Sequence, residues 1–168
     1  MTLTTHGVTG ALIVASMPVY PVVGLTLAFG SHFLLDALPH WDYKILSLDK
    51  IEAKKGVVVM TGGRNFFLDL FRIGTDGFLG LMLTAGISLF FFDSVLWLLI
   101  AGALAAMFPD FLQFVFGRFK FEFLRPLQNF HSDIHTKIKI EDNLLYGVGS
   151  QAGLICLCLI LFYYLRLI

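Results

Sequence analysis

The feature that most limits how this chain can fold is a series of long apolar stretches separated by short polar ones. Two of them, at about residues 65–92 and 144–165, are longer than the roughly 20 residues with which an α-helix crosses a bilayer. The composition agrees, because 57% of the residues are hydrophobic and only 14% are charged, against roughly 25% charged residues in soluble domains. The sequence therefore predicts an all-α, polytopic membrane bundle, with residues 1–168 forming a single integral membrane domain.

Proline, glycine and polar residues divide the apolar stretches into about five expected transmembrane helices. The first ends near Met17 after about 14 residues, so its length of about 21 Å falls short of a bilayer core of about 30 Å. It either spans thinly or is partly re-entrant. The others are expected at about residues 22–38, 65–92, 95–116 (with a kink or break at Pro109) and 144–165, and a short additional helix at about 126–136.

The distribution of positive charge predicts the orientation. All Lys and Arg residues except Arg166 lie in or beside two polar segments, at residues 39–64 and 117–143. The positive-inside rule places both segments in the cytoplasm, together with the N-terminus, and leaves the C-terminus outside. All five histidines then lie on the cytoplasmic side. The net charge is zero, and nothing in the composition indicates binding to nucleic acid.

Histidine and aspartate residues concentrate near the cytoplasmic ends of the expected helices. His32 and Asp36 are four residues apart, as are His131 and His135, so each pair shares one face of a helix. Ionisable groups in a membrane are costly and by default mark a functional site. The expected metal ligands are His6, His32, Asp36, His40, Asp76, His131 and His135.

Mixed imidazole and carboxylate ligands suit a divalent metal, with zinc expected first and manganese or iron as alternatives. Seven candidate ligands exceed one tetrahedral site, so either two ions bind or several of these residues support the ligands of one ion. A bound metal lowers the pKa of water towards 7, and a neighbouring carboxylate can then accept the proton. On position alone, Asp42 and Asp110 are the expected catalytic bases.

Purely structural explanations exist for several of these residues. Asp76 can form an ion pair with Arg72, one helical turn earlier, and the spacing of His131 and His135 is also common among solvated surface histidines. Basic residues near the membrane surface either hold anionic lipid headgroups or only determine topology. An aromatic belt at the membrane interface is the expected role of Trp41, Tyr43, Phe119, Phe121 and Phe123.

Four short segments resemble, in this order, a bacterial and archaeal inner-membrane family of membrane-bound metal-dependent hydrolases: TTHGVTGALI, HFLLDALPHWDY, FPDF and HSDIH. A more distant likeness is to the zinc-dependent phospholipase C group. His6 matches an early Thr-His element of the family, whereas His40 stands where an aspartate is common. The resemblance implies an inner-membrane metal-dependent hydrolase with a phosphoester or lipid-linked substrate at the cytoplasmic face, and membrane lipid as its partner.

Two other classes of function compete with hydrolysis. One is a metal-binding membrane protein without catalysis, such as a transporter or sensor, and the other is a structural helical membrane protein. A transporter needs ionisable residues at the midplane and on both sides of it, but the outer half of this chain has almost none. The chain also lacks a serine nucleophile elbow, a glycine-rich phosphate loop and a dinucleotide-binding fingerprint. We therefore expect a metal-dependent hydrolase first.

Overall fold

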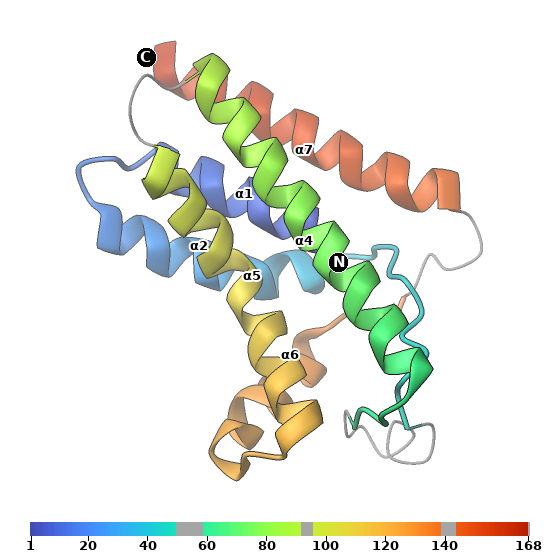
Figure 1. Cartoon of the computed structure of the whole chain (residues 1–168). Coiled ribbons are helices and arrows are strands. Elements are labelled where there is room, and N and C mark those ends of the chain that lie inside the picture. Colours follow the sequence, from blue (N-terminus) through green and yellow to red (C-terminus); the bar gives the residue numbers. More distant parts are fainter. Residues whose placement is uncertain (50–58, 92–95, 139–143, 168) are drawn as a thin grey trace.

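The described residues of the computed structural model, 1–49, 59–91, 96–138 and 144–167, form an all-helical bundle (Figure 1). Helix accounts for 78% of the structure, and the described residues contain no strand. The all-α prediction is confirmed. The elements are α1 (Leu3–Ala15), α2 (Pro21–Asp36), α4 (Arg64–Phe91), α5 (Leu96–Phe119), the 3-10 helix η1 (Glu122–Leu124), α6 (Arg125–Ile134) and α7 (Leu144–Leu167).

Three helices, α4, α5 and α7, are long and apolar enough to cross a membrane. The other two apolar helices are shorter, since α1 has 13 residues and α2 has 16. At 1.5 Å per residue they reach about 20 Å and 24 Å, less than a bilayer core of about 30 Å. The predicted count of five spans is therefore not confirmed, and both short helices fall below the length of a full span.

Helix α1 is the central element of the bundle and contacts α2, α4, α5 and α7. Its side chains Val8, Ala11 and Leu12 are buried in the main hydrophobic cluster, together with Leu99 from α5. Small residues allow this central position, because helices in membranes approach closely where side chains are small. At Gly10, an added Cβ would lie 2.5 Å from the backbone oxygen of Gly102 in α5.

Helix α5 continues through Pro109 as one helix, so the expected break does not occur there. Proline lacks the backbone N–H that would complete the helical hydrogen bond at this turn. In the same region the carbonyl of Ala106 accepts a hydrogen bond from His32 Nδ1 at 2.8 Å. The turn around Pro109 thus provides a backbone contact to a histidine of α2.

We predict that Gly10→Ala destabilises the bundle by about 1–3 kcal/mol, the usual range for overpacking a tight contact. The added methyl group would overlap the backbone of α5 at Gly102. The matched control is Gly86→Ala in α4, where a Cβ has no neighbour within 4 Å. Thermal unfolding in detergent should show a lower midpoint for Gly10→Ala alone. Equal midpoints for the two variants would contradict the proposed close packing of α1 on α5.

Candidate metal centre

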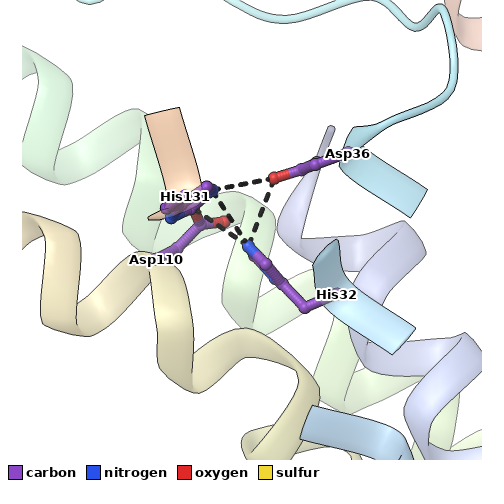
Figure 2. Close-up of side chains that lie close together, drawn as sticks. All are labelled: His32, Asp36, Asp110 and His131. Atoms are coloured by element: carbon purple, nitrogen blue, oxygen red, sulfur yellow. Dashed lines mark hydrogen bonds and ion pairs between the residues drawn. The ribbon is translucent and has the colours of Figure 1, made fainter. Parts of the chain in front are cut away.

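The buried carboxylate of Asp36, at the end of α2, faces His32 and His131 in the site (Figure 2). Its Oδ2 lies 3.2 Å from His32 Nε2 and 3.0 Å from His131 Nε2. Its Oδ1 points to other partners, with His6 Nε2 at 3.1 Å and His40 Nε2 at 3.9 Å. The carboxylate of Asp36 is therefore common to two groups of possible ligands, and His135 Nε2, of the second group, lies 4.0 Å from Oδ2.

The first group consists of His32, Asp36, Asp110 and His131, from α2, α5 and α6. Its ligand atoms lie within 4.8 Å of one another. His32 Nε2 is 3.3 Å from His131 Nε2 and 3.6 Å from Asp110 Oδ1. Ligand atoms around a tetrahedral ion with bonds of about 2.0–2.1 Å are about 3.3 Å apart. The spacing of this group therefore fits one small divalent ion.

The second group consists of Asp36, His40 and His135, whose ligand atoms also lie within 4.8 Å of one another. His40 belongs to the loop that follows α2, and His135 directly follows α6. Asp42 completes this side of the site, because its Oδ2 lies 3.1 Å from His40 Nε2 and 3.5 Å from His135 Nε2. Asp36 is common to both groups, so the arrangement can hold two ions with a shared carboxylate between them.

Backbone carbonyls orient three of the histidines. The Nδ1–H groups of His32, His40 and His135 donate to the carbonyl oxygens of Ala106, Leu38 and Thr136, at 2.8, 2.7 and 3.1 Å. In a neutral imidazole with its proton on Nδ1, the lone pair is on Nε2. Each Nε2 therefore directs a lone pair into the site, where carboxylate oxygens are also acceptors. Metal-binding histidines are commonly held in this way.

A positive charge is already stabilised on the side of the second group. The amino group of Met1 lies 2.8 Å from Asp36 Oδ1, 2.9 Å from Asp42 Oδ1 and 2.8 Å from His40 Nε2. Burial lowers the pKa of this amino group, but the nearby Asp36 and Asp42 carboxylates outweigh burial and raise it. A divalent ion at this position would have to displace the amino group.

Asp42 and His135 titrate as partners. Burial raises the pKa of the Asp42 carboxyl, but the neighbouring His135 and His40 side chains and the Met1 amino group outweigh burial and hold that pKa well below its usual range. The hydrogen bond to Asp42 in turn raises the pKa of His135, against the effect of burial. Asp42 is therefore ionised at neutral pH, and a metal ion must compete with a proton for His135.

Asp76, expected as a metal ligand or as a partner of Arg72, lies outside both groups. Its carboxylate accepts hydrogen bonds from the backbone N–H groups of Leu3 and Thr4, at 2.6 and 3.3 Å, and from Thr4 Oγ1 at 2.7 Å. It thus caps the N-terminus of α1 from α4, where a negative charge also complements the helix dipole. Tyr43 OH donates to the same carboxylate at 3.4 Å. Asp76 therefore positions the elements that surround the site.

His6 contacts the site without belonging to either group. Its ring is fully buried and stacks on the His32 ring, with 4.0 Å between the ring centroids. Its Nε2 is 3.1 Å from Asp36 Oδ1, while its buried Nδ1 has no hydrogen-bond partner among the described residues. This geometry suits a residue that orients Asp36, since the carboxylate oxygen can only accept a hydrogen bond.

Gln151 is a positioning residue that the sequence analysis missed. Its Oε1 accepts hydrogen bonds from Thr2 Oγ1 and Thr5 Oγ1 at 2.7 and 2.9 Å, and its Nε2 donates to the Trp41 carbonyl at 2.9 Å. It thereby attaches α7 to the N-terminus of α1 and to the loop after α2. The sequence does contain a signal for this role, because an amide side chain inside an apolar membrane stretch needs polar partners.

All the expected site residues except Asp76 surround Asp36, and both expected bases, Asp42 and Asp110, lie beside a histidine of one group. No protein-family model, curated protein or solved structure matches this chain. The function of this chain is therefore inferred from the geometry of the site.

We predict that Gln151→Leu destabilises the protein and weakens metal binding. The change leaves two threonine hydroxyl groups and a carbonyl without their partner, and one unsatisfied buried group costs about 1–3 kcal/mol. Ser150→Ala is the control, because Ser150 is exposed and bonds only within its own helix among the described contacts. Thermal unfolding and metal content should both change in Gln151→Leu and stay at the wild-type values in Ser150→Ala. A Gln151→Leu variant with unchanged metal content would argue against a positioning role.

Proposed function

We propose that this chain is an integral membrane hydrolase that uses two divalent metal ions, one on each side of Asp36. We propose a phosphoester or lipid-linked substrate and a site on the cytoplasmic face of the inner membrane. The lysine and arginine distribution supports this orientation, with the N-terminus and both polar segments in the cytoplasm and the C-terminus outside.

The observation that carries the proposal is the convergence of acceptor atoms around Asp36. The Nε2 atoms of His32 and His131 and a carboxylate oxygen of Asp36 lie 3.0–3.3 Å from one another. Such atoms repel unless a proton or a cation lies among them. Their donor chemistry suits zinc first, and also manganese or iron.

The partial exposure of one side of the site favours catalysis over a purely structural role. Side chains of Asp42, Asp110 and His135 are 24, 27 and 23% exposed, whereas Asp36 is buried. Structural metal sites are closed, and catalytic sites keep an open position. A substrate and a water molecule can therefore approach from the side of Asp42 and Asp110.

The residues divide the proposed chemistry among them. Asp36 holds the two positions at a fixed separation and is too buried to exchange protons with solvent. A divalent ion supplies Lewis acidity, which makes a nearby water acidic enough to lose a proton near neutral pH. Asp42 and Asp110 are the carboxylates that can take up this proton, since both lie beside the histidines and are partly exposed.

The first test is metal stoichiometry. We expect about two zinc, manganese or iron ions per chain after reconstitution, measured by elemental mass spectrometry on detergent-purified protein. His131→Ala should lose one ion and His40→Ala the other, while Asp36→Ala should lose both because both groups share this carboxylate.

Asp133→Asn is the matched control, because Asp133 is an exposed carboxylate on α6, two residues from His131. It should keep both ions. A wild-type protein that takes up no metal would refute the proposal, and loss of both ions in His131→Ala and in His40→Ala would contradict two separable positions.

The second test is hydrolysis. With metal bound, the wild-type protein should cleave a chromogenic phosphodiester or a phospholipid in mixed micelles. Asp42→Asn should lower kcat by about 10²–10⁴-fold, the usual contribution of a general base, and retain its metal, since Asp42 lies outside the two ligand groups. Metal-loaded wild-type protein that hydrolyses none of these esters would favour a metal-binding protein without catalysis.

A further inference from the structure

The turn that follows α5 carries a row of exposed aromatic side chains. Phe119, Phe121 and Phe123 are 58, 47 and 77% exposed. Adjacent rings in the row are stacked, with centroids 5.8 Å apart and interplanar angles of 15° and 21°. Contiguous exposed apolar side chains of this kind mark a contact surface rather than an ordinary water-facing surface. In Figure 1 this turn lies at the lower end of α5, where the chain enters α6.

The backbone of the turn is also unusual. Lys120 has a φ of 59°, and it is the only described residue other than glycine with a positive φ. Its N–H bonds to the Phe116 carbonyl at 2.9 Å and closes the end of α5. Glycine is the preferred residue at such a helix end, because it adopts this conformation without strain. A lysine at this position adds a positive charge at the cost of that strain.

Positive charge predominates beside the aromatic row. The side chains of Arg118 and Lys120 are both exposed. The acidic residue of the turn, Glu122, is neutralised by Arg125, whose Nε and Nη2 lie 2.6 and 2.7 Å from its two carboxylate oxygens. The surface thus combines flat apolar rings with cationic groups and lacks a free negative charge among these residues.

We propose that the turn 118–123 binds the headgroup region of a leaflet that contains anionic phospholipid. Aromatic side chains concentrate at membrane interfaces, and lysine and arginine beside them attract anionic headgroups. The turn directly follows α5, which is long and apolar enough to cross a membrane, so it emerges where an interface is expected. This inference does not depend on the proposed hydrolase function.

A turn located at the headgroups would also set the depth of the metal centre in the membrane. Asp110 precedes Phe119 by nine residues in the continuous helix α5, a distance of about 14 Å along the axis. When the aromatic row lies at the headgroups, Asp110 lies below them, within the thickness of the leaflet. A group attached to a lipid can approach the site from this side without leaving the membrane.

The test measures depth with nitroxide spin labels in liposomes. Cys156→Ser and Cys158→Ser first remove the two native cysteines, and single cysteines then replace Phe121 and Phe123. A nitroxide free in the buffer is the water-side reference. Collision rates with oxygen, which dissolves in lipid, and with a water-soluble nickel chelate report the position of each label. Size-exclusion profiles and thermal unfolding verify that each labelled variant is folded.

We expect the collision rate with oxygen to exceed that with the nickel chelate at positions 121 and 123, and the reverse for the nitroxide free in the buffer. Addition of phosphatidylglycerol to phosphatidylcholine liposomes should move labels 121 and 123 deeper, and Arg118→Gln with Lys120→Gln should abolish this shift. Preferential collision with the nickel chelate at 121 and 123 would overturn the proposal and leave a protein partner as the occupant. If the depth of labels 121 and 123 did not change with phosphatidylglycerol, the requirement for anionic lipid would be overturned.

Discussion

The structure depends on compensation of one buried carboxylate. Asp36 ends α2 inside an apolar bundle, where an isolated negative charge would be strongly destabilising. Its partners come from four other parts of the chain: the N-terminal residue, α1, the loop after α2, and α6 with the residue that follows it. Each of these parts of the chain is therefore held near Asp36 by polar contacts as well as by apolar packing. Removal of any partner leaves charge or lone pairs without compensation, so the site and the bundle are stabilised together.

The arrangement of α1 makes this convergence possible. Gly10 lets α1 approach α5 closely, and Asp76 and Gln151 hold its first turn from two other helices. A helix held at its N-terminus by hydrogen bonds and along its length by backbone contact has little freedom to rotate or slide. His6 consequently faces Asp36 in a single orientation, and the same restraint keeps α2 beside it. The accuracy of a metal site depends on such supporting contacts as well as on the ligands.

Hydropathy and helix periodicity predicted much of this protein, but not its tertiary contacts. The apolar stretches identified the five apolar helices α1, α2, α4, α5 and α7, and the i, i+4 spacing identified His32 with Asp36, because both signals are local. The approach of His131 to His32 joins residues 99 apart and follows from packing alone. Asp76 illustrates the same limit, because a carboxylate that caps another helix looks identical, in sequence, to a metal ligand. The count of five spans is not confirmed, because α1 and α2 are apolar but have only 13 and 16 residues.

The shortness of α2 has a consequence for the surrounding lipid. Its outer side chains Val22, Val23 and Leu34 are exposed, yet the helix offers about 24 Å of length, against about 36 Å in α5. A bilayer adapts to such a hydrophobic mismatch by thinning locally beside the short element. In a bilayer, the leaflet beside α2 would therefore be drawn inward towards the end of that helix. Phospholipid headgroups at this place would descend towards His40 and Asp42, so the shape of the bundle itself shortens the distance between the membrane surface and the site.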